Sequence, residues 1–158
     1  MLRRMLVPID GTRSSSSVVP YAAELANSLG CQVDLLLVEE GRGGRLPHPE
    51  HHQPKHRTGG EAGALAVGAS TPEGTREAYQ NYLARHAEEF AAQGIETNSH
   101  VRRGKPVDEI LRAALDLRCD IIAMATRHRG QFARPHAGSV AEEVVWRSRL
   151  PVLLIAEG

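Results

Sequence analysis

The sequence predicts an α/β protein with a single doubly wound, five-stranded parallel sheet and helices on both faces. Short apolar runs alternate along the chain with segments that repeat apolar residues at helical spacing. Several of these runs are continuous, which is typical of strands buried on both faces of a parallel sheet. The length of 158 residues suits one domain with a sizeable core.

The first expected strand and helix come before the first cysteine. The run MLVPI at 5–9 ends at Asp10-Gly11, which is a turn signal, so it indicates a strand. TRSSSS then supplies helix-capping residues, and a helix is expected to begin around Ser16 or Ser17. Its apolar stripe, and the glycine expected just after its end, are Val18, Tyr21, Ala22, Leu25, Leu29 and Gly30.

A second strand and an unusual segment follow. QVDLLLVE at 32–39 is nearly all apolar at its centre and is expected to be a buried strand. Residues 41–74 are rich in glycine, proline and histidine and show no period. The segment is too long for an ordinary connection, so a mobile loop is expected. Its histidines fit no fixed metal-site template, and no metal site is expected at His48, His51, His52 and His56.

The second half of the chain continues the alternation. The expected elements are a helix over 75–93, a strand over 95–102, a helix beginning at Pro106, a strand over 120–125, a helix over 139–148 and a strand over 151–156. The helix over 75–93 has a stripe of Tyr79, Leu83 and Phe90. The helix beginning at Pro106 has the best stripe in the chain, which consists of Val107, Ile110, Leu111, Ala114 and Leu115.

Composition excludes several classes of function. Lys plus Arg and Asp plus Glu number 19 each, so the chain lacks the charge of a nucleic-acid-binding protein. No apolar run is long enough for a membrane helix, and the first residues are too short a run for a signal peptide. A cytoplasmic protein is therefore expected. Cys31 and Cys119 share no metal or redox spacing and are expected to be buried thiols.

Ligands of open α/β sheets bind beyond the carboxyl ends of the strands, where the strand order reverses. Asp10 ends the first strand, and its carboxylate can bind a ribose hydroxyl or Mg²⁺. Without a ligand, it can form an Asx turn or cap the first helix. Gly138 and Ser139 begin the last helix, whose free amides favour a phosphate. Ser139 can equally be a plain helix cap, and no nucleophile–base set appears in the sequence.

Three separated segments carry a family resemblance. They are MLVPIDGTRSSSSVVPYAAELANSLGCQVDLLLVEE, RGKPVDEILRAALDLRCDIIAMATR and GSVAEEVVWRSRLPVLLIA. Over nearly its whole length, apart from residues 41–74, the chain resembles a universal stress protein of the adenine-nucleotide-binding type. The resemblance implies one domain over 1–158 with a Rossmann-like, adenine nucleotide alpha hydrolase-like fold.

The nucleotide loop of this family has the form G-2x-G-9x-G-[S/T], and this sequence departs from it. Counting back from Gly138-Ser139 gives A-2x-H-9x-G-S, with Ala125 and His128 at the earlier glycine positions. A non-glycine residue in a left-handed backbone costs about 1–2 kcal/mol, or roughly a tenfold loss of affinity. The His128 ring either blocks the phosphates or, when protonated, contacts them with Arg127 and Arg129 beside it. Both outcomes stay open.

The resemblance also assigns positions around an adenine nucleotide. Asp10 matches the acidic residue near the nucleotide, and Pro8 and Val38 match positions that line the adenine pocket. The matches to the two ends of the phosphate loop are Met124, Ala125, Gly138, Ser139 and Val140. The implied ligand is ATP or a related adenine nucleotide, with Mg²⁺ as an accompanying ion.

Three functions compete at this point. The first is a stress-response protein that binds ATP and signals by conformational change, with slow hydrolysis at most. The second is a dimeric interaction protein in which His128 blocks the site and an unidentified protein is the partner. The third is an enzyme acting on phosphates. The strand at 151–156 is an apolar edge, and the last strand of the resembling family pairs across a dimer, so a homodimer is expected.

Overall fold

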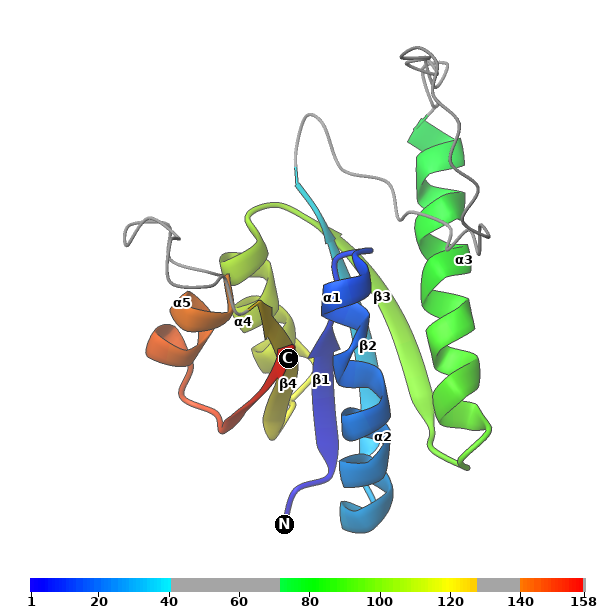
Figure 1. Cartoon of the computed structure of the whole chain (residues 1–158). Coiled ribbons are helices and arrows are strands. Elements are labelled where there is room, and N and C mark those ends of the chain that lie inside the picture. The colour runs from blue at the N-terminus through cyan, green and yellow to red at the C-terminus, as the bar shows by residue number, and fades with distance from the viewer. Residues whose placement is uncertain (41–71, 128–139, 158) are drawn as a thin grey trace, which may run out of the picture.

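The protein is represented by a computed structural model that describes residues 1–40, 72–127 and 140–157. Five parallel strands form one sheet in the order β3-β2-β1-β4-β5, with helices on both faces (Figure 1). The predicted fold class is therefore confirmed. The strands are β1 (Arg4–Pro8), β2 (Gln32–Glu39), β3 (Thr97–Arg103), β4 (Ile121–Arg127) and β5 (Val152–Glu157). The helices are α1 (Arg13–Ser16), α2 (Val18–Leu29), α3 (Pro72–Ala91), α4 (Pro106–Asp116) and α5 (Val140–Arg147).

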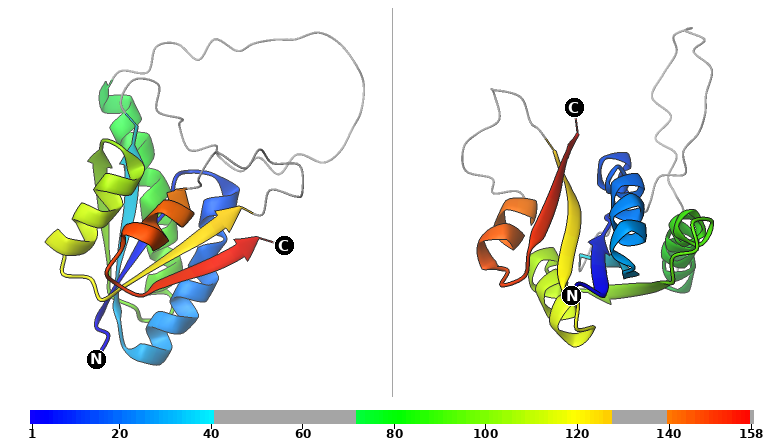
Figure 2. Two further views of the ribbon diagram at one scale, coloured as in Figure 1. Left: turned by 90° about the vertical axis from the view of Figure 1, so that its left-hand side faces the viewer. Right: turned by 90° about the horizontal axis from the view of Figure 1, so that it is seen from below.

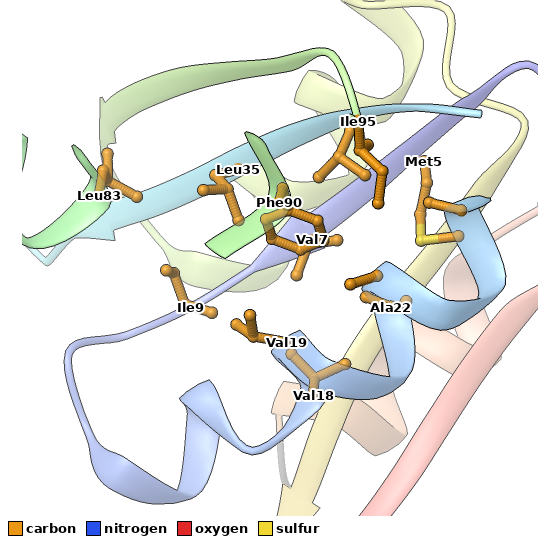
Figure 3. Close-up of a cluster of buried hydrophobic side chains, with 14 of the residues drawn as sticks. Met5, Val7, Ile9, Val18, Val19, Ala22, Leu35, Leu83, Phe90 and Ile95 are labelled. Carbon is orange, nitrogen blue, oxygen red and sulfur yellow. The ribbon is translucent and has the colours of Figure 1, made fainter. Parts of the chain in front are cut away.

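The core consists of two apolar layers, one on each face of the sheet. Side chains alternate between the two faces along a strand, so neighbouring residues of β1 enter different layers. Met5 and Val7 pack with α2 and α3, as Figure 3 shows, whereas Leu6 packs with α4 and α5. Figure 2 shows the same division, with α2 and α3 on one side of the sheet and α4 and α5 on the other.

The strand order reverses between β1 and β4. The chain begins at the centre of the sheet, moves outward through β2 and β3, and returns to the other side of β1 with β4 and β5. β1 pairs with β2 along its whole length from Arg4 to Pro8, but it pairs with β4 only at Met5 and Leu6. The carboxyl ends of β1 and β4 therefore separate. The short helix α1 follows β1 and lies against β4.

Local sequence signals explain where α2 ends and where α4 begins. Gly30 follows α2 with a φ of 66°, a left-handed conformation that glycine adopts without steric cost. Its amide and that of Cys31 bond to carbonyls of the last turn of α2, as the sequence predicted for a glycine in this place. Pro106 occupies the first turn of α4, where its missing N–H is tolerated.

The expected boundary between the loop at 41–74 and the next helix was wrong. Residues 72–74 belong to α3, which begins at Pro72. Proline is favoured in the first helical turn, and Gly74 costs a helix about 1 kcal/mol without ending it. Residues 41–71, including the four histidines considered as metal ligands, lie outside the described residues.

The predicted apolar stripes were too wide. Tyr21 and Leu115 are 55% and 74% exposed, and Leu29 at the end of α2 is 37% exposed. Each of the first two lies on the far side of its helix from the residues that face the sheet. The face of α4 that is buried consists of Val107, Ile110, Ala113 and Ala114. The stripe of α3 is confirmed, since Tyr79, Leu83 and Phe90 are all buried.

Within the described ranges, no helix is both long enough and apolar enough to cross a membrane.

Candidate functional site

Asp10 follows β1 at the point where the strand order reverses. The Thr12 amide and hydroxyl both donate hydrogen bonds to Asp10 Oδ1, at 2.9 Å and 2.6 Å. This arrangement is an Asx turn, one of the interpretations that the sequence left open for Asp10. Gly11 has a φ of 81°, a conformation that favours glycine at this turn. The turn leaves Asp10 exposed at the carboxyl edge of the sheet.

Ser15 stabilises the turn through hydrogen bonds to both Asp10 and Thr12. Its Oγ accepts the Asp10 amide hydrogen at 2.9 Å and donates to the Thr12 carbonyl at 3.0 Å. The Ser15 amide in turn donates to Thr12 Oγ1 at 3.1 Å. These bonds connect residues 10, 12 and 15 into one short network. The Asp10 carboxylate is consequently held in one place before any ligand arrives.

The predicted adenine positions lie beside this turn on neighbouring strands. Pro8 is buried at the end of β1 and pairs with Leu36 of β2. Val38 lies two residues further along β2 and packs against the same apolar layer as Met124 of β4. Ala125 packs against the opposite layer. Pro8, Val38 and Met124 thus bring an apolar surface to the carboxyl edge of three adjacent strands.

Only part of the predicted phosphate loop can be placed. β4 carries Met124 and Ala125, and α5 begins at Val140, which is 38% exposed. Because α5 follows β4, its first turn lies at the same edge of the sheet. The other predicted phosphate contacts, namely His128, Arg129, Gly138 and Ser139, lie outside the described residues.

Sequence reasoning missed a buried carboxylate in the middle of β2. Asp34 is 1% exposed, although the run around it is apolar. Its Oδ1 lies 2.8 Å from His100 Nε2 on β3, and its Oδ2 lies 3.5 Å from Arg4 Nε on β1. Asp34 pairs with Leu6, before the carboxyl ends of the strands. The cluster joins three strands and is separate from the Asp10 turn.

Both cysteines are buried thiols, as expected. Cys31 and Cys119 are 5% and 6% exposed. Burial, followed by the Asp34 charge, raises the pKa of Cys119 to about 12. Burial also raises the pKa of Cys31, assisted by Asp120. A thiol with a raised pKa carries little thiolate near neutral pH, so neither cysteine suits nucleophilic or redox chemistry.

Sequence reasoning also missed Tyr82 of α3. Its ring belongs to the apolar layer that contains Ile9, Val18 and Val19, the residues just before and just after the Asp10 turn and α1. Tyr82 follows Tyr79 by about one helical turn, but the predicted stripe of α3 did not include it and gave no sign that it lies near residue 10. That proximity depends on how α3 crosses the sheet.

Comparisons with known proteins agree with this architecture. The model of the universal stress protein family matches residues 1–156. A universal stress protein in the QAH/OAS sulfhydrylase 3′ region of Thermus aquaticus is 34% identical over 70 residues, which are 44% of this chain. The chain spans about half the length of that curated relative, 51%.

Solved structures with similar folds cover almost all of the chain. A universal stress protein in complex with cAMP has a TM-score of 0.66 and 17% identity, covering 99% of this chain and 98% of its own. A universal stress protein from Archaeoglobus fulgidus in complex with dAMP has a TM-score of 0.63 and 19% identity, covering 98% of both chains. These identities establish the fold alone. The match over residues 1–156, however, means that the chain belongs to the universal stress protein family.

Proposed function

We propose that this protein binds ATP or a related adenine nucleotide at the carboxyl edge of β1 and β4. The observation that carries the proposal is the Asp10 turn, which holds an exposed carboxylate where the strand order reverses. A carboxylate at the end of a strand in such a sheet is well suited to accept hydrogen bonds from ribose hydroxyls.

The surroundings of Asp10 suit the rest of the nucleotide. Pro8, Val38 and Met124 supply apolar contacts of the kind that an adenine ring fits. The first turn of α5 lies at the same edge, and helix N-termini attract phosphates. We propose that His128, Arg129, Gly138 and Ser139 contact the phosphates, with Ala125 at the start of that loop and Val140 at its end.

The ligands named for two similar structures support an adenine nucleotide. One was solved in complex with cAMP and another in complex with dAMP. ATP itself is the proposal for this chain, with Mg²⁺ held by phosphate oxygens and the Asp10 carboxylate, since Mg²⁺ prefers oxygen ligands. The proposed output is conformational signalling in the cytoplasm, with slow hydrolysis at most. In this role the protein reports on the nucleotide and does no substrate chemistry.

We also propose that two copies of the protein form a homodimer through residues 151–156. β5 is at the edge of the sheet and pairs with β4 on one side only. Its apolar residues Val152, Leu153, Leu154 and Ile155 are only partly buried. On the adjoining helix, Trp146 is 87% exposed and Val145 is 41% exposed. An exposed edge strand beside apolar side chains favours pairing with a second chain.

Nucleotide binding is tested with freshly purified protein. Small molecules released by denaturation are identified by mass spectrometry, and melting is followed with increasing ATP and Mg²⁺. A ligand of the folded state stabilises it by RT ln(1 + [L]/Kd), about 2.7 kcal/mol at a hundredfold excess over Kd. An adenine nucleotide in the released fraction and a rising melting temperature are expected. A constant melting temperature at millimolar ATP would refute the proposal.

A second candidate is an interaction protein whose site is closed to nucleotides. His128 at a family glycine position favours it, as does the hydrogen bonding that already engages Asp10 Oδ1. Its partner would then be another protein that binds the dimer surface. The variant His128→Gly separates the two candidates. If only the glycine variant binds ATP, the interaction protein is the correct description of the natural chain.

A further inference from the structure

The Tyr82 hydroxyl is buried without a hydrogen-bond partner among the described residues. Tyr82 is 5% exposed, and its ring meets His86 edge-to-face with centroids 4.8 Å apart. The guanidinium of Arg85 lies 5.8 Å from the ring centroid. The Tyr82 ring thus contacts two neighbours on α3, while its hydroxyl has no hydrogen bond to any residue that the structure describes. A buried hydroxyl without a bond is costly, which calls for a physical explanation.

The Tyr82 ring packs in the apolar layer that also contains Ile9 and Val18, which flank the Asp10 turn and α1. Burial raises the pKa of the Tyr82 phenol, and the negative charge of Asp10 raises it further, whereas the hydroxyls of Ser15 and Ser16 lower it. Both serines are therefore close to the phenol. Neither serine makes a hydrogen bond of ordinary geometry with the Tyr82 hydroxyl, which has no partner among the described residues.

Ser15 can accept one more hydrogen bond. A serine hydroxyl offers one donor and two acceptor positions. The Ser15 hydroxyl donates to the Thr12 carbonyl and accepts the Asp10 amide, which leaves one acceptor position. A phenol donates readily and lies next to it. A small movement of the turn toward α3 would therefore satisfy the Tyr82 hydroxyl without breaking a bond of the turn.

We propose that Tyr82 is a positioning residue for nucleotide binding: when a nucleotide engages Asp10, the Tyr82 hydroxyl donates a hydrogen bond to Ser15 and holds the turn against α3. This inference rests on the proposed function. Through Ser15, the bond acts on the same network that orients the Asp10 carboxylate. The phenol itself is buried and touches no ligand. Nucleotide binding would thereby be coupled to the packing of α3 against the turn.

The test is the variant Tyr82→Phe, which removes the hydroxyl and keeps the ring. One hydrogen bond formed only in the complex is expected to contribute about three- to tenfold in affinity. ATP binding by calorimetry should weaken by that factor. The melting temperature of the nucleotide-free variant should stay the same or rise, because an unsatisfied buried hydroxyl is removed. A merely structural role would lower this melting temperature instead.

Tyr79→Phe is the matched control. Tyr79 is also a buried tyrosine of α3, but its phenol lies near Glu39, which together with burial raises its pKa. This variant should bind ATP as the natural protein does. A spectroscopic readout accompanies both variants: with ¹³Cζ-labelled tyrosine, the Tyr82 resonance should move on ATP addition. Tyr21, which is 55% exposed, should remain unchanged as the internal reference.

The outcomes separate this inference from the proposed function. If the natural protein binds no nucleotide, both fail. If it binds ATP and Tyr82→Phe binds equally well, the function stands and the positioning role is refuted. Weaker binding accompanied by a lower melting temperature would also refute it, because the hydroxyl would then support the fold. Weaker binding with an unchanged or higher melting temperature, and a shifted Tyr82 resonance, establishes it.

Discussion

Asp34 Oδ1 on β2 lies 2.8 Å from His100 Nε2 on β3, and this contact connects the edge strand β3 to its neighbour β2. The two partners differ in burial. The Asp34 side chain is 1% exposed, whereas the side chains of His100 and Arg4 are 29% and 35% exposed. Asp34 Oδ2 has the Arg4 ion pair at 3.5 Å but accepts no hydrogen bond from the described part of the chain. Loss of a partner therefore leaves the buried Asp34 carboxylate with no access to water, whereas loss of Asp34 leaves two side chains that water can reach.

This asymmetry predicts that removing His100 costs more stability than removing Asp34. His100→Ala leaves a buried carboxylate without its hydrogen bond and should lower the free energy of unfolding by about 3–5 kcal/mol. Asp34→Val fills the site with an apolar residue that suits a strand, and leaves two partners that reach water. It should cost less than His100→Ala. Urea unfolding at neutral pH measures both, and equal or reversed losses would contradict the argument.

Gly30 provides a test of backbone strain without crowding. A Cβ added at Gly30 would meet nothing within 4 Å, yet the φ of +66° is one that side chains disfavour. Gly30→Ala should therefore destabilise the protein by about 1–2 kcal/mol through strain alone. Gly74→Ala is the control, because Gly74 is an exposed residue within α3. It should stabilise by up to about 1 kcal/mol. Thermal unfolding distinguishes the two signs.

The parts of the fold that local patterns determine were predictable from the sequence. The continuous apolar run of β2, the glycine after α2 and the proline that starts α4 each act through neighbouring residues. Stripe residues such as Leu115 were wrong because apolar spacing does not indicate how much of a helix the sheet covers. Asp34 was missed because its partners come from other strands.

The candidate site also contains residues that local sequence patterns predicted and residues that they did not. Asp10 and the end of β4 were predictable, since strand ends and turn residues are local signals. The capping stretch TRSSSS indicated a helix start, but it did not reveal that Thr12 and Ser15 fasten Asp10. Tyr82 is distant in sequence from residue 10, and only the packing of α3 brings its hydroxyl near the turn.

The proposed function predicts a large effect of Asp10 on ATP binding. Asp10→Ala removes an exposed carboxylate, so ATP affinity should fall by about 10- to 100-fold, the value of one charged hydrogen bond or two. Thr12→Val removes the hydroxyl bond to Asp10 Oδ1 and the oxygen that accepts the Ser15 amide, while the Thr12 amide bond to Asp10 remains, and should weaken binding by about threefold. Calorimetric titration measures both. An Asp10→Ala variant with natural affinity would exclude Asp10 from the site.

The proposed dimer predicts that a charge on β5 separates the protomers. Ala156 is exposed on β5, and lysine on an edge strand opposes pairing with another strand. Ala156→Lys should raise the dimer dissociation constant by at least about tenfold, because burying an unpaired charge is costly. Leu115→Lys introduces the same charge at an exposed position of α4 and should leave the dimer intact. Sedimentation velocity over a concentration series reports both; identical behaviour of the two variants would contradict dimerisation through β5.

The buried thiol of Cys119 predicts a loss of stability in alkaline solution. Its pKa is raised from 9.0 to about 12 in the folded protein, first by burial and then by Asp34. Above pH 9 the unfolded chain loses the thiol proton while the folded protein keeps it, so the folded state binds more protons and its stability falls as the pH rises. The fall should extend from about pH 9 toward pH 12, and the thiol should contribute no pH dependence below that range. Cys119→Ala lacks this contribution, so the difference in unfolding free energy between the natural protein and the variant should change with pH only in the alkaline range.

A thiol reagent at pH 8 should also label Cys119 slowly in the folded protein and rapidly in urea, because only the thiolate reacts. Rapid labelling of the folded protein would show that Cys119 is accessible and its pKa ordinary.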